Sequence, residues 1–138
     1  MQSTKILIVE DDIDIRESLT DFLTWEEFKV ASAGNGKEAL DFLESNDPPS
    51  LIFLDQMMPV MDGPELLAKL EEKYPQFKVP VVIVSANAYT GQSPLVVDYM
   101  KKPLDLDNIV SMITRYTLLP AVSMMTPQRI LPVSLGTC

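Results

Sequence analysis

The sequence predicts an α/β protein built around one parallel β-sheet. Short apolar runs alternate along the chain with segments whose apolar residues recur at helical spacing. Two of these runs, Leu51–Leu54 and Val81–Val84, are apolar throughout, which is typical of strands buried on both faces of a parallel sheet. Strands that alternate with helices form βαβ units with right-handed crossovers. We therefore expect a parallel sheet covered by helices.

The first half of the chain predicts two strand–helix pairs. Lys5–Val9 is an apolar run that ends abruptly in acidic residues, and Asp14–Trp25 then carries apolar residues on one helical face. Phe28–Ala33 predicts a second strand, which a Gly-Asn-Gly turn at 34–36 ends. Lys37–Glu44 predicts a second helix. An Asn-Asp-Pro-Pro sequence at 46–49 ends it.

The second half continues this alternation. The strand Leu51–Leu54 leads through a loop to a helix over about 64–73, whose proline at 64 suits the first helical turn. Val81–Val84 is the fourth predicted strand, and Val97–Lys101 is a weaker fifth. Leu106–Tyr116 has apolar residues on one side and predicts the last helix.

Length and charge limit the classes of function. The chain has 138 residues, which fits one domain, and a net charge of −9 from 11 basic and 20 acidic residues. This charge argues against unaided nucleic-acid binding, and no apolar run approaches the length of a membrane-spanning helix. Histidine is absent, which excludes catalysis by histidine within the chain. With one cysteine and no signal-peptide pattern, we expect a cytoplasmic protein.

The composition changes near residue 118. We expect a folded domain over residues 1–117 and an apolar, proline-containing tail over residues 118–138, which is too short for a second domain. One interpretation is a loosely ordered tail along the edge of the core. The other is a docking or dimerisation arm, because its leucine, isoleucine and methionine side chains would be costly to leave in water.

Polar residues follow four of the five predicted strands. Glu10 and Asp11 follow the first strand, Asp55 the third, Ser85 the fourth and Lys102 the fifth. In an open parallel sheet, groups just past the carboxyl ends of the strands meet in one crevice. Magnesium takes one or two protein carboxylates together with phosphate oxygens. The sequence therefore predicts a site for a divalent metal and a phosphoryl group.

Asp55 is the candidate nucleophile of this site, because a carboxylate can attack phosphorus to form an acyl phosphate. Lys102 is expected to pair with Asp55 and then with phosphoryl oxygens, and Ser85 to hydrogen-bond a phosphoryl oxygen. Simpler interpretations remain: a turn residue at Asp55, a solvated lysine, and a serine that caps locally. The acidic residues after the first strand also have a simpler interpretation: they are a solvated cluster in which Asp12 starts the first helix.

Four segments carry a resemblance to a known family. KILIVEDD, LIFLDQMMPVMDGPELL, VVIVSAN and YMKKPLD are similar, in this order, to segments of the receiver domain of bacterial two-component response regulators. The resemblance covers about residues 4–117. It implies a flavodoxin-like three-layer sandwich with a five-stranded parallel sheet in the order 2-1-3-4-5, and a Mg²⁺ cofactor.

The resemblance also implies a role for each matching residue. Asp55 corresponds to the phosphoacceptor, and Lys102 to a phosphate-binding lysine joined to Pro103 by a cis peptide bond. Ser85 and Tyr99 correspond to a hydroxyl and an aromatic ring that switch together. The magnesium ligands that the family implies are Glu10, Asp11, Asp55 and the backbone carbonyl of Met57.

The sequence departs from the family between the fourth and fifth strands. This stretch is several residues shorter than is usual, and Gly91 and Pro94 within it disfavour a helix. We therefore expect the fourth helix of the family to be short or absent. Since that helix helps to form the surface that partners recognise, the sequence supports phosphorylation better than it supports ordinary output.

Two loop residues flank the path of the hydrolytic water in the family, Met57 and Asn87. One hypothesis is that Met57 shields the phosphoryl group while Asn87 orients water. The alternative is that both are ordinary loop residues.

The leading functional prediction is a stand-alone receiver that accepts a phosphoryl group on Asp55 from a sensor histidine kinase or phosphotransfer protein. Such a chain is a signalling domain and not an enzyme; its downstream protein is unknown, and the last helices or the tail could form a homodimer. The alternative is a protein-interaction module that works without phosphorylation. A phosphatase is disfavoured because Met57 cannot act as a second acid, and a flavin-binding flavodoxin because the acidic loop would repel phosphate.

Overall fold

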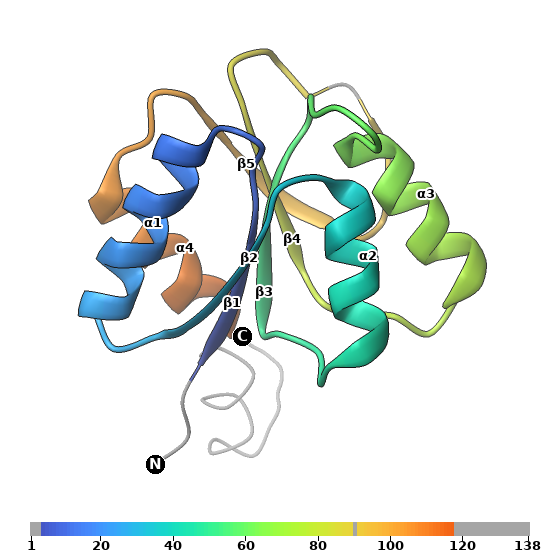
Figure 1. The fold of residues 1–138 in the computed structure, drawn as a ribbon, viewed down its shortest axis with the longest axis horizontal. Helices are drawn as coiled ribbons and strands as arrows, with labels where there is room; N and C mark the ends of the chain where they lie inside the picture. Colours follow the sequence, from blue (N-terminus) through green and yellow to red (C-terminus); the bar gives the residue numbers. More distant parts are fainter. Residues whose placement is uncertain (1–3, 90, 118–138) are drawn as a thin grey trace, which may run out of the picture. The chain divides into compact units, whose positions relative to one another are not determined.

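The sheet has five parallel strands in the order β2-β1-β3-β4-β5, which confirms the predicted fold class (Figure 1). The computed structural model describes residues 4–89 and 91–117, so the predicted tail over 118–138 lies outside the described residues. The chain divides into two units, residues 1–103 and 104–138. All five strands belong to the first unit: β1 (Lys5–Val9), β2 (Lys29–Ala33), β3 (Leu51–Asp55), β4 (Val81–Ser85) and β5 (Val96–Lys101).

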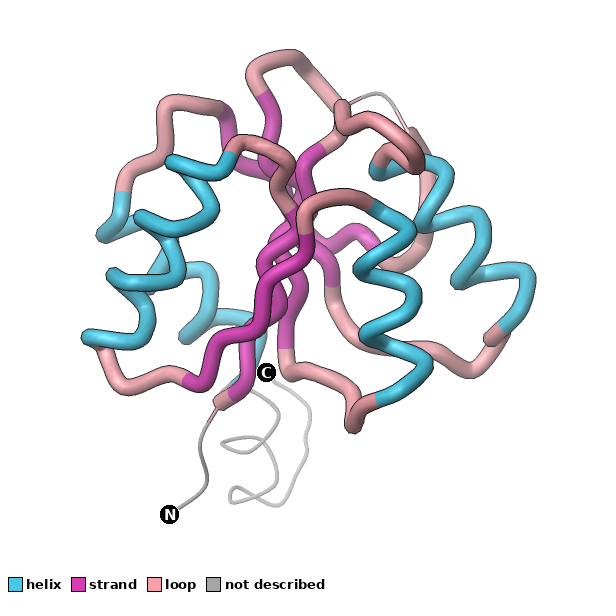
Figure 2. The backbone as a smooth tube through the Cα atoms, in the orientation of Figure 1, coloured by secondary structure: helices cyan, strands magenta, loops and turns pink. Residues whose placement is uncertain are grey.

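Three helices cover the sheet within the first unit. The helix α1 (Ile13–Trp25) lies on one face, and α2 (Gly36–Ser45) and α3 (Gly63–Lys73) lie on the other, as Figures 1 and 2 show. The second unit contains α4 (Leu106–Thr117). None of the helices in the described part of the chain is long and apolar enough to cross a membrane.

Side-chain caps fix the start of each helix in the first unit. The carboxylate of Asp12 accepts a hydrogen bond from the Ile15 N–H at 3.0 Å, as expected for the residue that starts α1. The helix α3 begins with a capping box, in which Asp62 and Glu65 each accept from the other's backbone N–H. These caps set the length of the loops that join the strands to the helices at the carboxyl edge of the sheet.

The central strands form the core and bring polar residues to one edge of it. Every residue of β3 and β4 is buried, and both strands run one residue further than the sequence predicted. Asp55 and Ser85 are therefore the last residues of their strands and not the first residues of loops. Together with Glu10, they are the buried polar side chains of the described residues.

The connection from β4 to β5 contains no helix in its described residues, 86–89 and 91–95. This confirms the expected loss of the fourth helix of the family. The segment is held locally instead, since the hydroxyl oxygen of Tyr89 accepts a hydrogen bond from the Ser93 N–H at 3.3 Å. A hollow of about 400 Å³ lies beside it, against α3.

Candidate functional site

Three acidic side chains from two strand ends lie close together. Glu10, Asp11 and Asp55 each place a carboxylate oxygen within 4.8 Å of the other two. Glu10 and Asp55 are buried, at 2% and 6% exposure, whereas Asp11 is open to solvent. Hard oxygen ligands with one open side fit Mg²⁺, which keeps several waters and uses few protein carboxylates. The donor set therefore fits the magnesium site that the sequence predicted.

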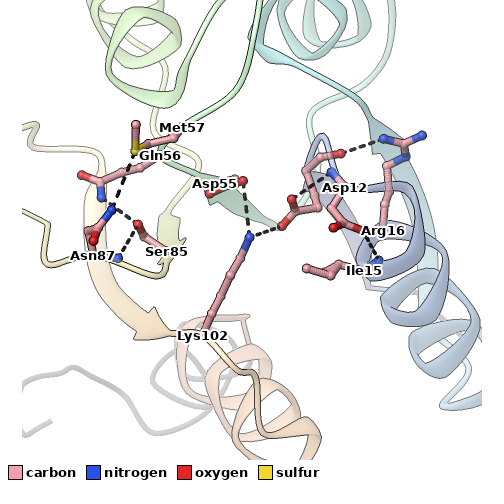
Figure 3. A network of polar contacts seen from close by, with 10 residues as sticks. Asp12, Ile15, Arg16, Asp55, Gln56, Met57, Ser85, Asn87 and Lys102 are labelled. Carbon is pink, nitrogen blue, oxygen red and sulfur yellow. Dashed lines mark hydrogen bonds and ion pairs between the residues drawn. The ribbon is translucent and has the colours of Figure 1, made fainter.

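Glu10 is fixed by contacts that the sequence did not predict. Its carboxylate accepts a hydrogen bond from the Asp12 N–H at 3.1 Å, and its backbone carbonyl accepts from Arg16 Nη1 at 2.7 Å (Figure 3). Arg16 lies one turn into α1, where its spacing alone resembles that of any helical surface residue. Its role becomes visible only once β1 and α1 pack together.

Lys102 joins the two buried carboxylates. Its Nζ lies 2.9 Å from Glu10 Oε1 and 3.5 Å from Asp55 Oδ2, the second contact being drawn in Figure 3. The predicted pairing with Asp55 is therefore present, but the nearer partner is Glu10. The Lys102–Pro103 peptide bond is cis, as the resemblance implied.

The pKa of Asp55 is raised to about 7, mainly by burial and then by the negative charge of Glu10. The charge of Lys102 and a hydrogen bond from the Met57 backbone limit this rise. For Lys102, burial disfavours the charged form, but the hydrogen bond to Glu10 and the charge of Asp55 outweigh it and raise its pKa. The site thus holds a protonated lysine beside carboxylates that a further cation would stabilise.

Ser85 lies at the end of β4, and its hydroxyl is held by two neighbours. Its Oγ accepts hydrogen bonds from Gln56 Nε2 at 2.9 Å and from the Asn87 N–H at 3.1 Å (Figure 3). The second bond is the local cap that the simpler interpretation of Ser85 predicted. Gln56 is not among the residues that the sequence predicted for the site, although it directly follows Asp55, which pairs with Val84, the residue before Ser85.

The remaining predicted residues lie at the surface. Met57 is 67% exposed, and its Sδ lies 3.8 Å from Asn87 Nδ2, so these two side chains are in contact. Tyr99 is 64% exposed and pairs in register with Ile83, two residues before Ser85. It is therefore on the strand next to Ser85 with its ring open to solvent.

Comparisons with known proteins show the family of the chain. The family model of the response regulator receiver domain matches residues 6–114. A probable transcriptional regulator, ycf29, of Pyropia yezoensis is 34% identical over 116 residues, which are 80% of this chain and 52% of that protein. The response regulator MprA of Mycobacterium tuberculosis H37Rv is 33% identical over 114 residues, 79% of this chain and 48% of that protein.

Two solved structures show the same fold. The response regulator TrrA of Thermotoga maritima, solved in complex with Mg²⁺ and BeF, has a TM-score of 0.71 at 27% identity, covering 82% of this chain and 98% of that one. The Francisella response regulator 1452 receiver domain has a TM-score of 0.75 at 28% identity, covering 83% of this chain and 97% of that one.

The chain belongs to the response regulator receiver domain family of two-component systems. It spans about half the length of the curated relatives that it matches. The fold and the family are thus shared with these relatives, whereas the rest of their length has no counterpart in the 138 residues.

Proposed function

We propose that this receiver is a signalling switch that accepts a phosphoryl group on Asp55 with the help of Mg²⁺. The observation that carries the proposal is the buried Asp55 carboxylate, which lies between two further carboxylates and the Lys102 ammonium. Glu10, Asp11, Asp55 and the Met57 carbonyl are the proposed metal ligands. Bound Mg²⁺ would neutralise the charge that builds up on the phosphoryl oxygens.

The residues of the chain position the reaction. An Asp55 carboxylate oxygen attacks phosphorus, an O–P bond forms, and the bond from phosphorus to the donor's nitrogen or oxygen breaks. Lys102 moves from the carboxylates onto a phosphoryl oxygen as a point charge. The Ser85 hydroxyl donates a hydrogen bond to another phosphoryl oxygen, and Tyr99 turns with it. Catalysis is mainly positioning and charge neutralisation.

The phosphoryl donor and the reader are separate molecules in this proposal. The chain contains no histidine, so another molecule must supply the group. We propose that in the cytoplasm this molecule is a sensor histidine kinase or phosphotransfer protein. We propose that a further protein recognises the phosphorylated receiver, and that these residues make no direct contact with nucleic acid. The net charge of −9 supports the last point.

Incubation with acetyl phosphate and Mg²⁺, followed by intact mass measurement, tests the proposal. We expect the mass of one phosphoryl group on the parent chain, and none on the Asp55→Asn variant or after Mg²⁺ is chelated. Asp62→Asn is a matched control, because it removes a carboxylate from the same loop but outside the acidic cluster. An unlabelled parent, under conditions that label a known receiver, would refute the proposal.

One observation favours a second candidate function, an interaction module that works without phosphorylation. The described residues between β4 and β5 form no helix, so part of the surface that changes in other receivers has a different structure here. Partner capture by the parent and by Asp55→Asn, each with and without beryllofluoride, separates the two functions. Equal capture in all four samples would favour the module.

A further inference from the structure

Gln56 connects the proposed phosphorylation site to the neighbouring strand. It directly follows Asp55, and its carbonyl accepts a hydrogen bond from the Gly63 N–H at 3.0 Å, which fixes its backbone. Its side chain reaches across to Ser85, where Nε2 donates to Oγ at 2.9 Å (Figure 3). The Asn87 N–H donates to the same oxygen at 3.1 Å.

These two bonds restrict what the Ser85 hydroxyl can do. A serine hydroxyl has two acceptor sites and one proton to donate, so Gln56 and Asn87 fill both acceptor sites. The proton remains for a further partner, which in the proposed function is a phosphoryl oxygen on Asp55. Ser85 is only 3% exposed, so water cannot easily replace Gln56 when the hydroxyl moves. For Ser85 to move toward a phosphoryl group on Asp55, the hydrogen bond from Gln56 must therefore break.

The side chain of Gln56 has space into which it can turn. It is half-buried and borders the hollow of about 400 Å³ against α3, whose other walls include Pro64, Leu67, Tyr89 and Gln92. No helix in the described residues between β4 and β5 covers this side. An amide that loses Ser85 can thus find water or polar groups in the hollow, which lowers the cost of its release.

We propose that Gln56 is a positioning residue that holds Ser85 in the unphosphorylated arrangement and releases it when Asp55 carries a phosphoryl group. This inference rests on the proposed function and adds the residue that sets the balance between the two states. One hydrogen bond typically changes such a balance by about fivefold. Phosphorylation would at the same time turn the Gln56 amide toward the hollow, which changes the polarity of that surface.

Beryllofluoride binding tests the inference, because beryllofluoride with Mg²⁺ mimics a phosphoryl group on aspartate. Gln56→Met keeps the length of the side chain but removes the donor. We expect it to bind beryllofluoride about fivefold more tightly than the parent in a fluorine NMR titration, while its affinity for Mg²⁺ alone is unchanged. In a Ser85→Ala background, Gln56→Met should have no effect, since the bond that it removes is already absent.

Each outcome of these titrations supports or overturns the inference. Two results would overturn the role of Gln56 and leave the proposed function standing. One is that Gln56→Met binds beryllofluoride no more tightly than the parent, and the other is that it gains as much affinity in the Ser85→Ala background. A parent that binds no beryllofluoride would overturn the proposed function as well. Gln56→Leu serves as a second variant if Gln56→Met unfolds, and the same two comparisons apply to it.

Discussion

The surroundings of Asp55 disfavour its negative charge. It is buried beside Glu10, and its pKa is raised from 3.8 to about 7. An acid whose pKa is raised in the folded state binds more protons when folded than when unfolded. In the absence of metal, the contribution of Asp55 to stability is therefore greatest below about pH 4 and is lost as the pH rises through 7.

The first prediction follows from this linkage. We expect Asp55→Asn to stabilise the metal-free protein at pH 8 by about 2 kcal/mol, with little change at pH 4, because asparagine carries no charge to bury. Lys102 keeps its 2.9 Å contact with Glu10, so it is not left unpaired. Urea unfolding in EDTA at the two pH values measures the effect. A variant that is less stable than the parent at pH 8 would contradict it.

A second prediction concerns Met57, Asn87 and the lifetime of the acyl phosphate. Their side chains are in contact, with Asn87 Nδ2 3.8 Å from Met57 Sδ, and the thioether has no strong hydrogen-bonding group to position water. We expect Met57→Asn to shorten the half-life of the acyl phosphate about fivefold, the effect of one added hydrogen bond to the attacking water. Intact mass against time gives the half-life. Met58→Leu, in the same loop, is the control, and an unchanged half-life in Met57→Asn would refute the shielding hypothesis.

At the scale of the element, the loop from β3 to α3 depends on a close approach of two backbone segments. Gly63 is not required here for its backbone angle, since no glycine among the described residues has a positive φ. A Cβ at Gly63 would lie 2.6 Å from the backbone oxygen of Asp55 and 3.2 Å from the Cα of Gln56. The absence of a side chain, and not a special backbone angle, is what this position requires.

We therefore expect Gly63→Ala to destabilise the protein by about 2 kcal/mol and to weaken Mg²⁺ binding, because backbone atoms at the site must move. Gly91→Ala is the control, since the atoms nearest to its Cβ would all belong to the Tyr89 side chain, at 2.6 Å from Oη, and not to the acidic cluster. Thermal unfolding and a Mg²⁺ titration of both variants test this. Equal effects at the two glycines would show that the contact with Asp55 is not the cause.

At the scale of the whole molecule, the parallel sheet gathers acids that lie 45 positions apart in the sequence, Glu10 and Asp55, into one cluster. A ligand that binds only this folded arrangement stabilises the protein by mass action. With Mg²⁺ at ten times its dissociation constant, we expect a gain of about 1.4 kcal/mol and a higher Tm. The loops after β1 and β3 must both be in place for this gain.

The measurement is Tm with EDTA and with increasing Mg²⁺, on the parent, Asp11→Asn and Asp14→Asn. Asp14 is exposed in the first turn of α1 and carries the same charge outside the cluster, so its variant should respond like the parent. Asp11→Asn should respond much less, because it loses a proposed ligand. Equal responses of all three proteins would indicate a general ionic effect and not a site.

Much of the fold and of the site was predictable from the sequence. Apolar runs set the five strands, and polar residues directly after them indicated the carboxyl edge, because parallel strands end there together. The absence of a helix from the described residues between β4 and β5 was also predictable, since Gly91 and Pro94 act locally. These features depend on composition and short-range spacing, which the sequence by itself determines.

Only the tertiary structure decided which side chains share a contact. Local spacing gives no sign that Lys102 lies nearer to Glu10 than to Asp55, that Arg16 holds the Glu10 carbonyl, or that Gln56 fills an acceptor site of Ser85. Each contact joins different elements and depends on sheet register and helix packing, to which many distant residues contribute. The sequence thus determined which chemical groups lie at the edge of the sheet, while packing determined which of these groups contact one another.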